Sequence, residues 1–246
     1  MRLDQHFLID YKILKRIIKL SKLKKRDVVL EIGAGKGNLT QLLAKKSKKV
    51  FAIEKDSSLF QELKKLDKNV EPKLGNALDI RFPKFNKIVS NIPYSISEPL
   101  IQKLIYYDFE LGVFLIPNKF SKILIGEKRT KLTLIARTFF EIKLHDLVPS
   151  HCFSPKPRTY SRIISIKPKK PNFRDSIFQE FIKQKDKKVK NALREAIIKT
   201  STKFYTKITK RKAKQIIKDL EINKKVQNLN LRELKRVKNY IANLNF

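Results

Sequence analysis

Two short motifs in this chain combine residue types that could do chemistry on a nucleic-acid base. The first, Asn91-Ile92-Pro93-Tyr94, follows an apolar run at 88–89, where a strand is expected to end. The side-chain oxygen of Asn91 and the backbone carbonyl of Ile92 can accept both hydrogens of an exocyclic amine, which favours the nitrogen lone pair. Pro93 stiffens the loop, and Tyr94 offers a flat face for stacking. Alone, the motif also fits a turn at the end of a strand, but together with a cofactor loop it would indicate methyl transfer to a base amine.

The second motif is a glycine-rich segment, Glu31-Ile32-Gly33-Ala34-Gly35-Lys36-Gly37, which ends an earlier predicted strand. Glycine permits positive φ and lets backbone amides approach a ligand closely. A strand, such a loop and then a helix place a ligand at the carboxyl edge of an open sheet. The G-x-G-x-G spacing differs from the dinucleotide pattern G-x-G-x-x-G, and alone it also fits an ordinary glycine-rich turn.

Two polar residues that follow later strands add weight to a nucleoside cofactor. Glu54 ends the second predicted strand, about twenty residues after the glycines, where a carboxylate can accept hydrogen bonds from ribose hydroxyls. Gly75-Asn76-Ala77-Leu78 follows the third strand, and its amide could read an adenine edge. A carboxylate at this point suits NAD as well as S-adenosylmethionine, so these residues predict a nucleoside without identifying it.

The pattern of strands and helices that must position these motifs predicts an α/β domain. Between residues 28 and 171, short apolar runs alternate with helical patterns, which is typical of a largely parallel, Rossmann-like sheet flanked by helices. The expected strands cover 28–32, 50–54, 70–74, 87–90, 111–116, 141–147 and 162–167. The expected helices cover 11–21, 39–46, 59–65, 99–107, 120–125 and 132–140.

A change in pattern marks a second domain. Pro168-Lys169-Lys170-Pro171 interrupts regular structure, and beyond it the chain has no glycine and no strand-like alternation. Apolar residues recur at helical spacing within 177–182, 193–198, 216–220 and 231–241. The sequence therefore predicts a catalytic, cofactor-binding domain at 1–171 and a small all-helical domain at 172–246.

The charge balance points to a polyanionic partner. Lys and Arg number 57 against 23 Asp and Glu, which gives a net charge of +34. Residues 172–246 hold 21 basic and 7 acidic residues, a net +14, so both predicted domains are basic. Proteins from thermophiles are usually enriched in both Lys and Glu, whereas acidic residues are scarce in this chain. Nucleic acid explains this excess best, although charge alone does not separate RNA from DNA.

Other features of the sequence bear on the cellular location of the protein and on whether it binds a membrane or a metal. No apolar run approaches membrane-spanning length, and the N-terminus lacks the features of a secretory signal. The single cysteine, Cys152, excludes an internal disulfide framework and argues against a multi-cysteine metal site. We therefore expect a cytoplasmic protein with no metal and no membrane partner.

Five ordered blocks resemble the ribosomal RNA adenine dimethyltransferases, which are class I S-adenosylmethionine-dependent enzymes that modify two adjacent adenosines of small-subunit rRNA. The blocks are residues 4–10 (Asp-Gln-His-Phe-Leu-Ile-Asp), 31–40, 75–78, 91–100 and 153–157 (Phe-Ser-Pro-Lys-Pro). The resemblance implies a class I methyltransferase sheet with a helical C-terminal domain. It also implies S-adenosylmethionine as cofactor, the rRNA of the 30S subunit as partner, and a monomer that acts during ribosome maturation.

The resemblance also implies roles for single residues. His6 and Leu8 would close over the cofactor, with Gly33 beneath its methionine part, Glu54 on the ribose and Asn76 on the adenine. Most relatives have Asp where this chain has Asn76, so the substitution Asn76→Asp is expected to leave cofactor binding unchanged or to strengthen it.

Around the target base, the resemblance implies that Asn91 borders both cofactor and adenine. Tyr94 would stack on the flipped base, and Phe153 would form a second aromatic wall. The loop after Pro157 reads Arg158-Thr159-Tyr160-Ser161 where the family usually has Lys-Val-Asp-Ser.

Several alternatives remain open at the level of the sequence. Methylation of one large-subunit rRNA adenine, as in the antibiotic-resistance methylases, uses the same N-I-P-Y loop. A DNA adenine methylase would need a target-recognition domain that the sequence does not indicate. A ribosome-assembly or transcription factor would not need Asn91 and Tyr94. An NAD oxidoreductase fits the segment from Gly33 to Glu54 but leaves the N-I-P-Y loop and the charge unexplained.

Overall fold

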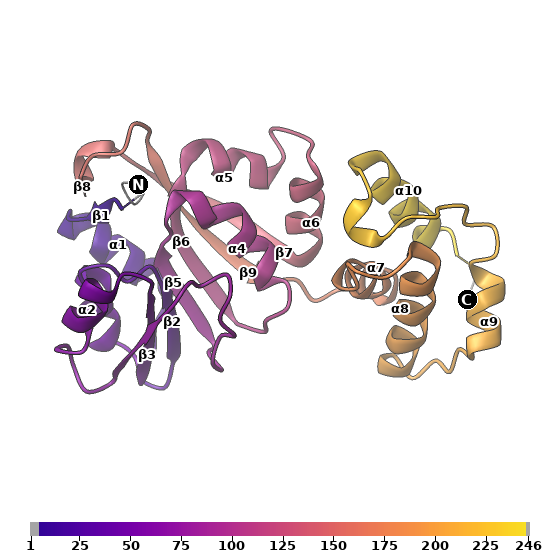
Figure 1. Ribbon diagram of the computed structural model, residues 1–246, viewed down its shortest axis with the longest axis horizontal. Coiled ribbons are helices and arrows are strands. Elements are labelled where there is room, and N and C mark those ends of the chain that lie inside the picture. The colour runs from indigo at the N-terminus through magenta and orange to yellow at the C-terminus, as the bar shows by residue number, and fades with distance from the viewer. Residues whose placement is uncertain (1–4, 245–246) are drawn as a thin grey trace. The chain divides into compact units, whose positions relative to one another are not determined.

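The computed structural model describes residues 5–244, which form two compact units. Within the described residues, the first unit comprises 5–128 and 140–168, and the second comprises 129–139 and 169–244 (Figure 1). Asp4 of the first sequence block lies outside the described residues. The second unit starts close to the Pro168–Pro171 boundary, but it also takes up a segment that the sequence places in the first domain.

The first unit contains a seven-stranded sheet and its flanking helices. The strand order is β4-β3-β2-β5-β6-β9-β7. The strands are β2 (Val28–Ile32), β3 (Lys49–Glu54), β4 (Val70–Leu74), β5 (Lys87–Asn91), β6 (Leu111–Pro117), β7 (Phe140–Val148) and β9 (Ser161–Pro168). The helices are α1 (Tyr11–Ser21), α2 (Asn38–Ala44), α3 (Ser57–Leu63), α4 (Ser97–Leu104) and α5 (Asn118–Ile125).

The sheet is parallel over β4, β3, β2, β5 and β6, and it becomes antiparallel at β9 and β7. The largely parallel sheet expected from the sequence is confirmed, and all seven strands lie close to their predicted ranges. The antiparallel end has a simple cause. A parallel neighbour needs a long crossover, usually a helix, whereas β7 returns to β9 through residues 149–160 without an α-helix.

Both faces of the sheet are buried, as a parallel sheet requires. Val29, Val89 and Val113 belong to one apolar cluster with Leu14 of α1 and Leu43 of α2. Successive side chains of a strand point to opposite faces. The neighbouring residues Leu30, Ile88 and Phe114 therefore face the other side, where they are equally buried.

Three helices of the first unit end earlier than the sequence predicts. Helix α4 stops at Leu104 rather than residue 107, because Tyr106 and Tyr107 close shorter turns onto the carbonyls of Lys103 and Leu104. Helix α2 stops at Ala44 rather than residue 46, and α3 stops at Leu63 rather than residue 65. Such ends depend on local turn geometry that apolar periodicity does not encode.

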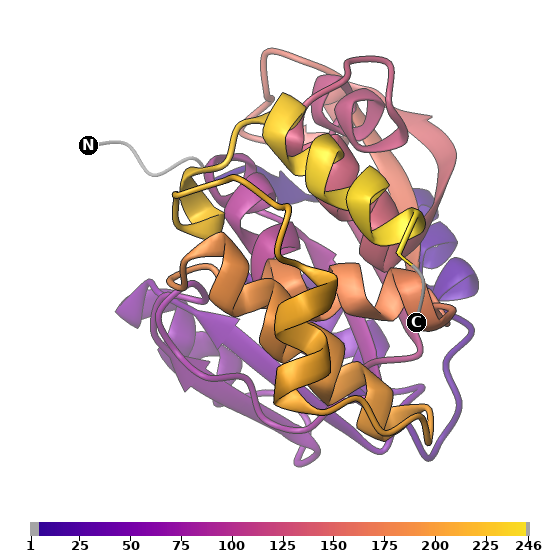
Figure 2. The same ribbon diagram turned by 90° about the vertical axis from the view of Figure 1, so that its right-hand side faces the viewer.

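The second unit contains helices and no strand among its described residues, apart from an isolated β-bridge between Lys188 and Lys225. Its helices are α6 (Lys131–Phe139), α7 (Phe173–Lys183), α8 (Val189–Lys203), α9 (Lys210–Ile216) and α10 (Leu231–Ala242). Helix α7 packs against α6, α8 and α10, and α9 packs against α8 (Figure 2). The longest, α8, has 15 residues, and no helix within 5–244 is both long and apolar enough to cross a membrane.

Helix α6 is the clearest departure from the predicted boundary. Its apolar residues Leu132, Ile135 and Phe139 are buried, and its packing partners include α7 and α10 of the second unit. The periodicity of α6 predicts a helix correctly, but it cannot show which apolar face the helix covers.

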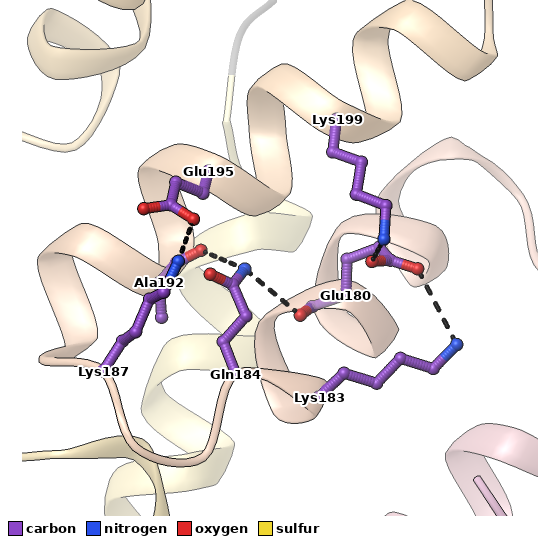
Figure 3. Close-up of polar contacts among 7 residues, drawn as sticks. All are labelled: Glu180, Lys183, Gln184, Lys187, Ala192, Glu195 and Lys199. Atoms are coloured by element: carbon purple, nitrogen blue, oxygen red, sulfur yellow. Dashed lines mark hydrogen bonds and ion pairs between the residues drawn. The ribbon is translucent and has the colours of Figure 1, made fainter. Parts of the chain in front are cut away.

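Polar contacts fix α7 against α8 (Figure 3). The Gln184 amide donates to the carbonyls of Glu180 and Ala192, at 3.3 and 3.0 Å. The Glu180 carboxylate pairs with Lys199 of α8 at 2.6 Å. Lys187 pairs with Glu195 in the same view. The carboxylates of Glu180 and Glu195 are therefore both engaged in ion pairs.

Candidate active site

One pocket in the first unit collects the motifs found in the sequence. It opens at the carboxyl ends of β2, β3, β4 and β5 and is covered in part by residues 5–7. Carboxyl ends of parallel strands share one edge, which is where ligands bind in open α/β sheets. Of the predicted site residues, eight line the pocket: His6, Gly33, Glu54, Asn76, Asn91, Ile92, Pro93 and Tyr94.

The glycine-rich loop packs directly on the N-I-P-Y loop. Gly33 has φ +69°, and a Cβ at this position would lie 2.9 Å from two ring carbons of Pro93. Gly33 therefore meets two demands at once, a left-handed backbone and close approach of a neighbouring ring. Its N–H donates to the Ile53 carbonyl at 2.8 Å, which ties the loop to the end of β3. The two motifs form one structure rather than two separate sites.

Backbone amides hold the Glu54 carboxylate in place. Its Oε2 accepts from the Gly35 N–H at 2.9 Å, and its Oε1 accepts from Lys55 and Asp56 at 2.8 and 3.0 Å. The residue is buried, with 6% of its surface exposed, and it lines the pocket. A carboxylate fixed in this way presents its remaining lone pairs in one orientation, as recognition of a ribose diol requires.

A second carboxyl group lies buried under the same loop. Glu31 is 2% exposed, and its Oε2 has no hydrogen-bond partner among the described residues. Burial, reinforced by the charge of Glu54, raises the pKa of Glu31 to about 8. The group therefore holds its proton at neutral pH.

Asn91 has one half of its amide fixed and the other half unsatisfied. Its Nδ2 donates to the His6 carbonyl at 2.9 Å, and this contact determines which way the amide points. Its Oδ1 is buried and accepts no hydrogen bond from any described residue. A buried acceptor without a partner costs free energy, on the order of 1–3 kcal/mol. The pocket therefore presents an oriented acceptor that a donor on a ligand would satisfy.

The ring of Tyr94 is held from two sides. Its hydroxyl makes a hydrogen bond with the Ser161 hydroxyl of β9, and its ring lies 5.4 Å from the His6 ring at an angle of 41°. His6 in turn bonds the Pro155 carbonyl through Nδ1 at 2.9 Å. The N-I-P-Y loop, residues 5–8 and the F-S-P-K-P segment thus meet at one place.

Asn76 lines the pocket, but its side chain also closes a local turn. Its Oδ1 accepts from the Leu78 N–H at 3.1 Å, and its Nδ2 donates to Asp79 at 2.8 Å. The substitution Asn76→Asp would put a second carboxylate opposite Asp79 at this distance. This local like-charge contact, between residues three apart in the chain, opposes the expectation that the substitution preserves or strengthens cofactor binding.

Lys103 of α4 is a supporting residue that sequence reasoning missed. Its ammonium donates to the carbonyls of Ala77, Leu78 and Ile80, and it lies 4.4 Å from the centre of the Phe82 ring. Partial burial lowers the pKa of this ammonium group. Lys103 thereby fixes the loop that carries Asn76. A lone lysine inside a predicted helix gives no sequence signal for this role.

Two predicted site residues do not reach the pocket. Leu8 and Phe153 are opposite each other in the small antiparallel pair β1 (Phe7–Leu8) and β8 (Phe153–Ser154). They are 4% and 1% exposed and belong to the apolar core with Leu14. The Phe153 ring, expected as a second aromatic wall, is therefore buried in the core and does not line the pocket. The pair instead supports the segment that carries His6.

Other pocket residues went unassigned in the sequence. They include Gln5, Phe7, Gly35, Lys55, Ser95 and Ile96. Phe7 is the most informative, because a Cβ at Gly35 would meet its ring at 2.9 Å. Its place beside His6 in the first sequence block was the available signal.

The strand order and the pocket at the carboxyl ends of the parallel strands define a class I methyltransferase fold. Two solved structures share it over nearly the whole chain. A dimethyladenosine transferase from Plasmodium falciparum is 29% identical, has a TM-score of 0.65, and is matched over 98% of this chain and 100% of that one. The 23S rRNA methyltransferase ErmE is 19% identical with a TM-score of 0.63, over 96% and 99%; at that identity the likeness concerns the fold.

The sequence comparisons identify the family. The ribosomal RNA adenine dimethylase family profile matches residues 1–242. A probable ribosomal RNA small subunit methyltransferase A from Methanosarcina barkeri is 37% identical over 98% of this chain and 87% of its own length. The chain belongs to the ribosomal RNA adenine dimethylase family, and it is therefore an enzyme of the rRNA adenine dimethyltransferase type.

Proposed function

We propose that this protein dimethylates the N6 amines of two adjacent adenosines near the 3′ end of small-subunit rRNA, with S-adenosylmethionine as methyl donor. It acts on the 30S particle as a cytoplasmic monomer during ribosome maturation. The relatives named as small subunit methyltransferases and the +34 charge support an rRNA substrate. The observation that carries the proposal is the buried, unpartnered Oδ1 of Asn91 at the pocket wall.

The residues present fit S-adenosylmethionine. The Glu54 carboxylate, fixed by three amides, suits a ribose diol, and Asn76 lines the same pocket as the candidate partner of an adenine edge. Gly33 lines the pocket without a side chain, and a Cβ at this position would meet the Pro93 ring. When bound, the cofactor supplies an electrophilic methyl group on sulfur.

The chain's own residues prepare the amine. Asn91 Oδ1 accepts one hydrogen of the adenine amine, held in position by the bond from Nδ2 to His6. This contact keeps electron density on nitrogen and places it in line for displacement. Tyr94, restrained by Ser161, provides the stacking face. The Asn91 oxygen stabilises the positive charge that develops on nitrogen until the amine proton passes to water, so a strong general base is unnecessary.

The test is labelled methyl transfer to 30S subunits that lack the modification, with 50S subunits and DNA in parallel, followed by identification of the product nucleoside. We expect N6,N6-dimethyladenosine in the 30S sample alone. Labelling of 50S subunits would favour the large-subunit alternative, and labelling of DNA would favour a DNA methylase. No transfer to any substrate by folded, cofactor-binding protein would overturn the proposal.

The substitution Asn91→Ala tests the residue on which the proposed function rests. We expect methyl transfer to fall on the order of 10²-fold or more, as for other positioned acceptors and donors at a reacting centre. Folding and cofactor binding should remain largely intact. Asn239→Ala, which removes an exposed asparagine of α10, is the matched control and should leave the rate unchanged. Near-normal turnover by Asn91→Ala would remove Asn91 from its assigned role.

A further inference from the structure

The C-terminal end of α8 carries an aromatic residue that neither packing nor backbone preference explains. Tyr205 is 97% exposed, the highest value among the exposed large apolar residues of the described chain. Its φ is +58°, in the left-handed region that disfavours side chains other than glycine and asparagine. Residues held in such conformations persist where the surroundings fix them, and they occur disproportionately at functional sites.

The surroundings of Tyr205 do fix its backbone. The helix ends at Lys203, and the Thr206 N–H donates to the Ser201 carbonyl at 2.8 Å while the Tyr205 N–H donates to Thr202 at 3.3 Å. This pair of bonds is the Schellman motif, whose left-handed position is usually glycine. The preceding ring, Phe204, packs edge-on against Phe173 at 5.4 Å. The Tyr205 side chain is thus presented to solvent from a well-defined turn.

The segment around this ring is strongly basic. Residues 196–218 contain eight Lys or Arg and no Asp or Glu. Two nearby carboxylates are already used, since Glu180 pairs with Lys183 and Lys199, and Glu195 pairs with Lys187 (Figure 3). In contrast, six exposed cations make no ion pair with any described carboxylate: Lys203, Lys207, Lys210, Arg211, Lys212 and Lys214.

We propose that Tyr205 stacks on an unpaired base of the substrate RNA while the basic residues of 203–214 contact the adjoining phosphates. The inference rests on the proposed function, which supplies the RNA. An exposed ring next to unpaired cations is the combination with which proteins bind single-stranded nucleic acid, because stacking needs a free base face and the cations follow the backbone. A regular duplex offers the cations their phosphates but no base face for the ring.

Because the backbone at position 205 is left-handed, one substitution can remove the ring without straining the turn. Glycine is the favoured residue at this turn position, so Tyr205→Gly should leave the thermal stability unchanged or raise it. We expect the same variant to bind 30S subunits about 10-fold more weakly, within the range found for loss of one stacked base. KM for 30S subunits should rise correspondingly, with kcat and S-adenosylmethionine affinity unchanged. Tyr205→Phe should bind like the wild type.

Two controls complete the experiment. Tyr11→Ala removes another exposed tyrosine, whose ring already lies 4.5 Å from the Lys15 ammonium, and should not alter binding. Replacing Lys203 and Lys207 by Gln should flatten the dependence of log affinity on log salt by roughly 1.4–1.8, at about 0.7–0.9 per phosphate contact.

The outcomes separate this inference from the proposed function. Equal affinity of wild type and Tyr205→Gly for 30S subunits overturns the stacking role, while methylation by both proteins leaves the proposed function standing. A wild-type protein that methylates no 30S substrate overturns the proposed function instead. A drop in affinity shared by Tyr205→Gly and Tyr205→Phe would assign the effect to the hydroxyl and would also contradict stacking.

Discussion

Tyr94 shows how a single side chain can combine a surface for a base with a structural anchor. Its hydroxyl bonds Ser161, and its ring adjoins His6. We predict that Tyr94→Phe keeps most activity, because the ring remains, whereas Tyr94→Ala loses substrate binding and rate by roughly 1–3 kcal/mol of stacking. Ser161→Ala removes only the anchor and should resemble Tyr94→Phe. Steady-state kinetics with 30S subunits measure all three, and equal damage from Phe and Ala would assign the role to the hydroxyl.

Asn76 and Asp79 form a pair in which only one side chain carries a charge. Asn76→Asp would place two carboxylates where a 2.8 Å hydrogen bond now lies. We predict that this repulsion, on the order of 1 kcal/mol for a close like-charge contact in water, displaces the loop that carries residue 76 and thereby lowers S-adenosylmethionine affinity by up to about the same amount. The double variant Asn76→Asp with Asp79→Asn restores a donor and should recover the affinity. Calorimetric titration decides the point, and unchanged binding by the single variant would show that the loop relaxes freely.

Glu31 makes stability depend on pH. Its pKa is about 8 in the folded protein and near 4.5 when unfolded, so the folded state binds the extra proton between these values. The contribution of Glu31 to the free energy of unfolding is therefore greatest below pH 4.5, and it is lost as the pH rises towards 8. We predict that Glu31→Gln removes this dependence and raises the free energy of unfolding at pH 7 by as much as about 3 kcal/mol. Urea unfolding from pH 5 to 8 measures it; parallel curves for both proteins would contradict the assignment.

At the scale of elements, the site depends on two loops that occupy adjoining space. A Cβ at Gly33 would collide with Pro93 at 2.9 Å. We predict that Gly33→Ala displaces the N-I-P-Y loop and lowers methyl transfer more than it lowers stability. Gly126→Ala, at the left-handed end of α5 (φ +101°), is the matched control because it adds backbone strain of about 1–2 kcal/mol at a position that does not line the pocket. Thermal unfolding and turnover of both variants distinguish loop displacement from backbone strain. Equal loss of activity in both variants would mean that backbone strain alone explains the loss in Gly33→Ala.

At the scale of the whole molecule, the charge of +34 should govern affinity for RNA. We predict that 30S binding weakens steeply with salt, on the order of 10³-fold between 50 and 200 mM if about six phosphates are neutralised. Binding of S-adenosylmethionine to the same protein is the internal control and should change little. Filter binding over a salt series measures the slope, and a slope near zero would make the charge a general surface property.

Deleting residues 172–246 is a poor way to test the helical unit. Helix α6 would remain without α7 and α10, which would expose Leu132, Ile135 and Phe139 to water. Substitutions on the surface of the full chain avoid this, because they change charge without removing a packing partner.

Much of the fold could be predicted from the sequence, because its determinants are local. Strand positions follow from short apolar runs, and the glycine and N-I-P-Y loops mark where two of those strands end. Parallel strands bring their carboxyl ends to one edge, so Gly33, Glu54, Asn76 and Asn91 were expected to converge, and they line one pocket. The net charge and the absence of glycine beyond residue 171 are likewise properties of the chain itself.

Contacts between distant segments were decided only by the tertiary structure. The amide of Asn91 is oriented by a carbonyl 85 residues away, and Phe153 is buried because β8 pairs with β1. Helix α6 has the periodicity of any amphipathic helix, yet it joins the second unit because that unit covers its apolar face. A sequence specifies which residues can accept a hydrogen bond and which carry an aromatic ring. Only packing determines which acceptor stays unsatisfied and which ring remains in water.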